Sequence, residues 1–157
     1  DWQLGTAQLD LVMLPKQFIL SYIDSEGKKQ MPWVIHRAIF GSFERFIGIL
    51  LEHFNGALPF WLAPVQIVGI PVSEKHLLYA QDIATELRKK NIRIELFHAN
   101  ETLGKRIRQA EIQKIPYLLI IGEREIETKK IAVRERGKGD LGQKTVEEFL
   151  NQLPSTP

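Results

Sequence analysis

The 157 residues of this chain include no cysteine, which excludes disulfides and thiol catalysis and leaves four histidines as nitrogen ligands for a metal ion. The chain also lacks an apolar run of the roughly 18 residues that a membrane span requires. No basic segment followed by an apolar one opens it, so we expect a cytoplasmic protein without a membrane anchor. It begins with Asp1 rather than methionine, so we expect a piece cut from a longer protein.

No strong excess of one charge is present either. The 21 Lys/Arg and 19 Asp/Glu residues give a formal net charge of +2, and 44% of the residues are hydrophobic, enough for one or two small domains with a core. Residues 102–138 carry ten positive and five negative side chains. Mixed signs are typical of a solvated surface, so charge alone does not indicate a nucleic-acid partner.

Three strands and a helix are predicted in the first 60 residues. Polar and apolar residues alternate over 6–11, which is typical of a strand with one polar face. A second strand, 17–23, ends at the turn signal 24–27, and we expect it to pair antiparallel with the first. Pro32 opens a third strand over 33–37, which leads into the helix.

The helix predicted over 38–53 gathers its apolar residues on one side, which we expect to face a core. Its opposite side carries Gly41, Arg45 and Gly48. Glycine costs a helix interior about 1 kcal/mol relative to alanine, so two glycines around one arginine need a reason. Two interpretations stay open: tight packing or an exposed arginine without a task, and a flat or anionic ligand lying against this face.

From Val65 the pattern predicts strand, helix, strand, helix, strand, strand and helix. A buried strand, 117–121, is followed by a hairpin into the next strand, 129–134, and Thr145 with Glu148 forms a capping box for the last helix. The remaining elements are the strands 65–70 and 93–97 and the helices 73–90 and 102–113. This order predicts an α/β fold with a mixed sheet, and a boundary near Phe60 between domains 1–60 and 61–157.

Two groups of motifs resemble the class II aminoacyl-tRNA synthetases. Gly41-Ser42-Phe43-Glu44-Arg45-Phe46 resembles their motif 3, and the flanking segments 2–10 and 61–66 are similar to the threonyl-tRNA synthetase family. Leu103-Gly104-Lys105-Arg106-Ile107-Arg108 and Ile115-Pro116-Tyr117 resemble the anticodon-binding domain shared by the threonyl, prolyl, glycyl and histidyl enzymes. The resemblance runs to about Leu150. It implies the carboxy-terminal end of an antiparallel catalytic sheet plus a helix, followed by a mixed-sheet α/β anticodon-binding domain.

The resemblance implies a threonine–tRNA ligase, an enzyme of protein biosynthesis that joins threonine to ATP, releases pyrophosphate and passes the threonyl group to tRNA. It further implies ATP with Mg²⁺ as a substrate, Zn²⁺ in the intact enzyme, threonine tRNAs as partners and a homodimer. Motifs 1 and 2 are absent from these residues. We therefore expect the chain to bind tRNA without catalysing the reaction by itself.

The same resemblance assigns roles in the first domain. It implies that Arg45 contacts ATP and that Thr6, Gln8 and Ser42 lie near the threonine pocket, although an exposed polar face explains Thr6 and Gln8 without it. His36 matches one of three zinc ligands. A strand histidine taken alone is more often a hydrogen-bonded core residue. Since the other two ligands, a cysteine and a histidine, have no counterpart in this chain, we expect it to bind zinc poorly or not at all.

In the second domain, the resemblance implies contacts between anticodon bases and Asn100, Thr102, Glu125 and Arg134. Thr102 stands where a lysine is common in the family. Lys105, Arg108 and Arg136 are expected to meet phosphates, and a solvated surface is the alternative for all of these residues.

Two other functions stay open. One is a non-enzymatic RNA-binding or accessory module with the anticodon-binding fold. The other is a sibling ligase for proline, glycine or histidine, in which the match of His36 to a zinc ligand would be a coincidence.

Overall fold

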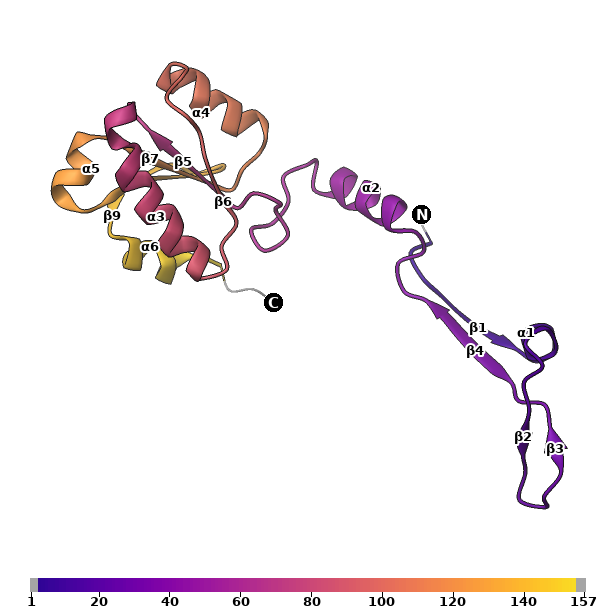
Figure 1. Ribbon diagram of the computed structural model, residues 1–157. Coiled ribbons are helices and arrows are strands. Elements are labelled where there is room, and N and C mark those ends of the chain that lie inside the picture. Colours follow the sequence, from indigo (N-terminus) through magenta and orange to yellow (C-terminus); the bar gives the residue numbers. More distant parts are fainter. Residues whose placement is uncertain (1–2, 155–157) are drawn as a thin grey trace. The chain divides into compact units, whose positions relative to one another are not determined.

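The computed structural model describes residues 3–154 in two compact units, which divide between Glu52 and His53 (Figure 1). We call them the amino-terminal and the carboxy-terminal unit. Trp2, part of the flanking resemblance, and the last three residues of the tail lie outside the described residues. The domain boundary near Phe60 stays a prediction.

The amino-terminal unit is built on a two-stranded antiparallel ladder of β1 (Thr6–Asp10) and β4 (Val34–Ala38). Between them lie a short helix, α1 (Met13–Gln17), and a small hairpin of β2 (Tyr22–Ile23) and β3 (Lys29–Gln30). The predicted pairing of 6–11 with 17–23 is therefore wrong. The Asp10 carboxylate accepts hydrogen bonds from the backbone of Val12 and Met13 at the start of α1, and only Tyr22–Ile23 of the expected strand 17–23 is a strand, paired with β3.

The turn predicted at 24–27 is present, but it joins β2 to β3. Asp24 holds it, because its carboxylate accepts from the backbone N–H groups of Glu26 and Lys28, both at 2.9 Å. Gly27 has a φ of +77°, a backbone conformation that favours glycine.

The helix α2 (Phe43–His53) begins later than predicted. Gly41 has a φ of +65° and precedes the helix, and the Ser42 hydroxyl caps it by accepting from the Arg45 backbone N–H at 3.2 Å. Of the two glycines on either side of Arg45 in the sequence, only Gly48 therefore lies in the same helix. The expectation that the apolar side faces a core is also wrong within the described residues, because α2 buries none of its side chains and Phe43 is 73% exposed.

The carboxy-terminal unit is a five-stranded mixed sheet in the order β6-β5-β7-β8-β9. β5 pairs parallel with β6 and β7, whereas β8 and β9 continue the sheet antiparallel from the central strand, β7. The strands are β5 (Ile67–Pro71), β6 (Ile94–Leu96), β7 (Tyr117–Ile121), β8 (Ile131–Glu135) and β9 (Gly139–Lys144). The helices are α3 (Leu77–Lys89), preceded by a 3₁₀ turn at Glu74–His76, α4 (Leu103–Ile112), α5 (Glu123–Thr128) and α6 (Val146–Gln152).

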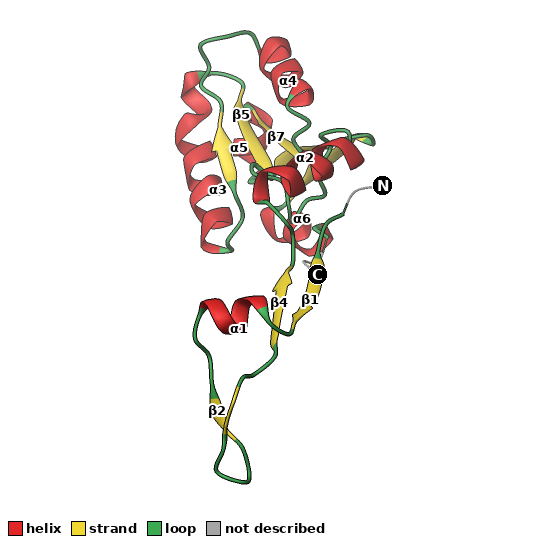
Figure 2. Cartoon of the chain, turned by 90° about the vertical axis from the view of Figure 1, so that its right-hand side faces the viewer, coloured by secondary structure: helices red, strands yellow, loops and turns green. Residues whose placement is uncertain are grey.

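Helices cover both faces of this sheet, because successive strand residues point to opposite sides. On one face Ile67 and Leu119 pack with Leu87 of α3 and Phe149 of α6. On the other face Val68 and Leu118 pack under α4. In Figure 2, α3 and α4 accordingly lie on opposite sides of β5 and β7. The predicted mixed α/β sheet is confirmed.

Two elements of this unit escaped prediction. β7 and β8 pair antiparallel as the expected hairpin requires, but the helix α5 connects them, and at its start Glu125 accepts a hydrogen bond from the Gly122 backbone. The last strand, β9, was not predicted, because Gly139 and Gly142 interrupt the alternation typical of a strand, and both have positive φ. Within residues 3–154, no helix is both long and apolar enough to cross a membrane.

Candidate functional site

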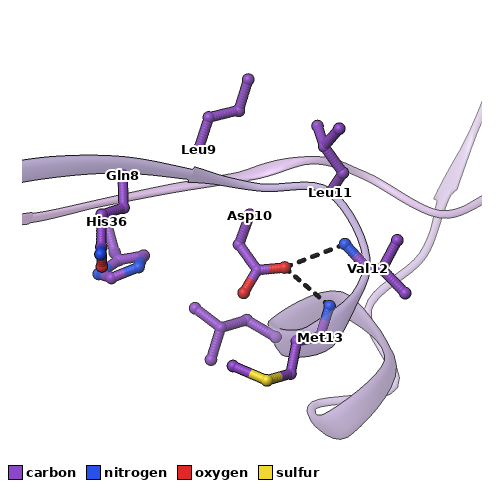
Figure 3. Close-up of a pocket in the computed structure, with 8 residues that line it drawn as sticks. Gln8, Leu9, Asp10, Leu11, Val12, Met13 and His36 are labelled. Atoms are coloured by element: carbon purple, nitrogen blue, oxygen red, sulfur yellow. Dashed lines mark hydrogen bonds between the residues drawn. The ribbon is translucent and has the colours of Figure 1, made fainter.

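The β1–β4 ladder brings Gln8 and His36 together. The two residues are direct cross-strand partners, so their side chains leave the ladder on the same face, where both are exposed (Figure 3). Thr6 and Asp10 share that face with Gln8 by alternation. An open hollow of about 760 Å³ runs along residues 8–14 and His36.

Asp10 is the residue of this face whose importance the sequence did not reveal. Its carboxylate accepts from the Val12 N–H at 3.0 Å and from the Met13 N–H at 2.7 Å. Desolvation would raise the pKa of Asp10, but the backbone N–H groups at the start of α1 and the nearby His36 outweigh it and lower that pKa from 3.8. The alternation of Thr6, Gln8 and Asp10 was the available signal.

The described residues do not form a zinc site by themselves. They contain no group of three His, Cys, Asp or Glu side chains close enough to hold a metal ion. His36 supplies one imidazole on an exposed strand, and a structural or catalytic zinc takes at least three protein ligands. The assignment of His36 to zinc stays a prediction about a longer protein, and in this chain the His36 side chain is exposed rather than buried in a core.

Arg45 and Ser42 lie together at the start of α2. Ser42 caps the helix, and Arg45 is exposed in the first turn. Among the described residues, no hydrogen bond or ion pair joins either of them to Thr6, Gln8 or His36. The segment that leads from β4 to α2 nevertheless runs close to the residue before β1. A Cβ added at Gly5 would stand 2.9 Å from the carbonyl oxygen of Ile39.

In the carboxy-terminal unit, the β8–β9 half of the sheet has a polar face that no hydrophobic cluster covers within the described residues. Arg134 and Ala132 of β8 point to the side of α4, as do their partners Leu118 and Ile120 in β7. The guanidinium of Arg134 lies 3.8 Å from the carboxylate of Glu111 in α4, and a third of the Arg134 side chain is exposed. We call this surface the open face.

The strand β9 contributes Asp140 and Gln143 to the open face. Asp140 is the cross-strand partner of Arg134, and Gln143 is the partner of Ala132. From α5, Glu125 reaches this face, because its Oε1 accepts from the Gln143 amide at 2.5 Å while its Oε2 accepts from the Gly122 N–H at 2.9 Å. The open face thus combines guanidinium donors with a fixed carboxylate acceptor.

Asn100 and Thr102 belong to the loop between β6 and α4, and both are exposed. Thr102 has a structural task, because its hydroxyl caps α4 by accepting from the Lys105 N–H at 3.4 Å. The adjoining Ala99 donates its backbone N–H to Glu74 at 3.2 Å, which ties this loop to the turn after β5. The structure therefore brings Glu125 and Arg134 to one face, whereas no described contact joins Asn100 or Thr102 to them.

The basic residues of this unit divide into anchored and exposed ones. Arg106 is 2% exposed and donates to the backbone oxygens of Glu101, Pro71 and Val72. Arg136 donates to the oxygens of Lys114, Ala57 and Leu58, and burial lowers its pKa. Arg108 is exposed, and Lys105 pairs with Glu101 at 2.7 Å on the surface. Arg136 is thus occupied by carbonyl groups, which argues against the expected phosphate contact.

Two family models match the chain. The model of the anticodon binding domain matches residues 66–156, and the model of the tRNA synthetase class II core domain (G, H, P, S and T) matches residues 1–54. The chain is 54% identical to the threonine–tRNA ligase of Carboxydothermus hydrogenoformans over 152 residues, which are 97% of this chain and 24% of that ligase. It therefore spans about a quarter of the length of the curated relatives that it matches.

Solved structures agree with this match. The RNA binding domain of threonyl-tRNA synthetase from Cryptosporidium parvum Iowa II superposes with a TM-score of 0.80 at 36% identity, over 99% of this chain and 40% of that one. Prolyl-tRNA synthetase from Cryptosporidium parvum, complexed with L-proline and AMP, gives 0.72 at 23% identity, over 94% of this chain and 33% of that one. The second likeness shows the shared fold.

Because the first model covers more than half of the chain, the chain belongs to the anticodon binding domain family, here preceded by a segment of class II synthetase core. Within that class its similarity is to the threonyl-tRNA synthetases, and the predicted family and fold are confirmed.

Proposed function

We propose that the carboxy-terminal unit reads the anticodon of threonine tRNAs through the open face, and that the intact protein is an ATP-dependent threonine–tRNA ligase. The observation that carries the proposal is the uncovered polar surface of β8 and β9, which lies inside the segment matched by the anticodon binding domain model. Similarity to threonine–tRNA ligases over 97% of the chain supports threonine over proline, glycine or histidine.

The chemistry of the open face suits unstacked bases. Loop bases expose their Watson–Crick edges, which a guanidinium can meet as a donor and a carboxylate as an acceptor. Arg134 keeps N–H groups available beside its 3.8 Å pair with Glu111, and Glu125 is held in a fixed orientation by two hydrogen bonds. Asn100, with one acceptor and two donors, serves as a third base contact from its exposed loop, and Thr102 supports that loop as the cap of α4.

In the amino-terminal unit, Thr6 and Gln8 line one side of a threonine pocket that the rest of the core completes, with Ser42 at the start of α2. Arg45 contacts ATP, which the intact enzyme uses with Mg²⁺, and its exposed guanidinium suits stacking on adenine or pairing with phosphate. His36 is one of three zinc ligands in the intact enzyme. We place that enzyme in the cytoplasm as a homodimer, by analogy with the family.

Affinity measurements on the chain test the proposal. The ligands are a threonine tRNA and the same tRNA with its second and third anticodon bases exchanged, each at two salt concentrations. We expect the exchange to weaken binding by about 1–3 kcal/mol for each base read directly. Equal, salt-sensitive binding of both tRNAs would mean that the unit offers only a basic surface without base recognition, and would contradict the proposal.

A pair of arginine variants sharpens the result. Arg134→Ala removes a base contact on the open face, so it is expected to abolish most of the discrimination. Arg108→Ala removes an exposed cation from α4, so it is expected to weaken both tRNAs alike. If Arg108→Ala lowers discrimination and Arg134→Ala does not, the open face is not the reading surface.

A further inference from the structure

The carboxylate of Glu125 is more firmly held than a glutamate in a short helix needs to be. Its Oε2 accepts from the Gly122 N–H at 2.9 Å, which caps α5, and its Oε1 accepts from the Gln143 side-chain amide at 2.5 Å. The second bond joins residues that are 18 positions apart and lie on different elements. A carboxylate that is already oriented loses less side-chain entropy when it meets a base.

A bulge in β9 puts Gln143 in this position. Between the pairs Ala132↔Gln143 and Arg134↔Asp140, β9 holds one residue more than β8. Gly142 takes up the irregularity with a φ of +77°, and its N–H donates to the Asp140 carboxylate at 2.8 Å. Regular alternation would send Gln143 to the same face as Leu141, which packs against the core. The bulge leaves Leu141 in place and turns Gln143 to the open face.

A glycine supplies the space on the other side of the carboxylate. A Cβ at Gly122 would stand 3.1 Å from Oε2 of Glu125 and 3.3 Å from a methyl group of Val72. Both distances are tighter than ordinary contacts, so a side chain at position 122 would require the Glu125 carboxylate or Val72 to shift by a few tenths of an ångström.

We infer that Gln143 is a positioning residue for anticodon reading: it orients the Glu125 carboxylate toward the base, and the Gly142 bulge exists to present it. This inference rests on the proposed function of the open face. Gln143 is exposed and adds no core contact, so its substitution leaves the fold intact.

The test compares three variants of the full chain with the same two tRNAs. Gln143→Ala removes the donor, Gln143→Glu keeps the shape but brings a second carboxylate beside Glu125, and Gln81→Ala, an exposed glutamine of α3, is the matched control. The readout is the ratio of the two dissociation constants. We expect Gln143→Ala to lower this ratio about fivefold to tenfold, because it removes a hydrogen bond to a charged group. Gln143→Glu is expected to lower it at least as much, while Gln81→Ala leaves it unchanged.

A double-substitution cycle separates positioning from direct contact. If Gln143 acts through Glu125, the variant lacking both side chains discriminates no worse than Glu125→Ala alone. Additive losses, or unchanged discrimination in Gln143→Ala, would overturn the inference while the proposed function stands. If the unmodified chain itself does not discriminate, the proposed function fails and the inference falls with it.

Discussion

Side chains satisfy backbone N–H groups at turns and helix starts in both units of this chain, but the two units differ in how many side chains they bury. In the amino-terminal unit, Asp10, Asp24 and Ser42 satisfy backbone N–H groups at turns and helix starts, yet Pro15 is the one buried residue among 3–52. In the carboxy-terminal unit, helices pack on both sides of the sheet, leaving only the open face uncovered in the part of the chain that the structure describes, and every buried hydrophobic residue lies at or after Phe60. Hydrogen-bonded turns and caps define elements, whereas stability requires apolar surface to be removed from water.

The largest expected contrast comes from two phenylalanines. Phe149 is 1% exposed and meets Tyr117 edge to face at 5.4 Å, so Phe149→Ala is expected to lower the free energy of unfolding by about 3–5 kcal/mol. Phe43 is 73% exposed, so Phe43→Ala is expected to change it by less than about 0.5 kcal/mol. Chemical denaturation measures both. Similar losses for the two variants would mean that α2 has a core of its own.

Two arginines of α4 extend the contrast to polar groups. Arg106→Met leaves the carbonyl groups of Glu101, Pro71 and Val72 without their donor, which is expected to cost about 2–4 kcal/mol of stability. Arg108→Ala, at an exposed position of the same helix, is expected to stay within about 0.5 kcal/mol. Thermal unfolding of the two variants side by side gives the comparison. If Arg106→Met left the stability unchanged, water would have to replace the three hydrogen bonds of Arg106.

A smaller effect is expected from the helix caps. Thr145 caps α6 by accepting from the Glu148 N–H at 3.1 Å, and Thr145→Ala is expected to cost about 1 kcal/mol in cooperative unfolding. Ser42 makes the corresponding bond in α2, but Ser42→Ala should leave the unfolding of the carboxy-terminal unit unchanged. Denaturation followed by the amide signals of each unit separates the two. Coupled losses would show that the units unfold together.

The smallest effect is a pH dependence at the start of α6. Hydrogen bonds from the backbone N–H and side chain of Thr145 lower the pKa of Glu148 from 4.5. Because the pKa is lower in the folded state, the stabilisation is present above pH 4.5 and is lost as the pH falls through the folded value. Glu148→Gln should therefore remove part of the acid sensitivity of unfolding, measured as the midpoint against pH. Glu147→Gln, an exposed neighbour in the same turn, is the control, and equal effects would argue against the hydrogen bond as the cause.

The sequence predicted best where one physical signal decided the outcome. The buried strand at Tyr117–Ile121 and the capping box at Thr145 are both present. The pairing of β1 failed because two neighbouring apolar segments do not reveal that Asp10 starts a helix between them. β9 failed because a bulge with positive-φ glycines interrupts its alternation. Motif resemblance named Glu125 and Arg134, but Gln143 became visible only when the bulge placed it beside Glu125.

Arg136 has a consequence for the order in which the chain is made. Its guanidinium donates to the carbonyl oxygens of Ala57 and Leu58, and the first of these lies 79 positions earlier in the sequence. At a synthesis rate of about 5–20 residues per second, those carbonyl groups are synthesised roughly 4–16 s before their donor. The carbonyl groups of Ala57 and Leu58 thus gain this donor only late in the translation of the carboxy-terminal unit.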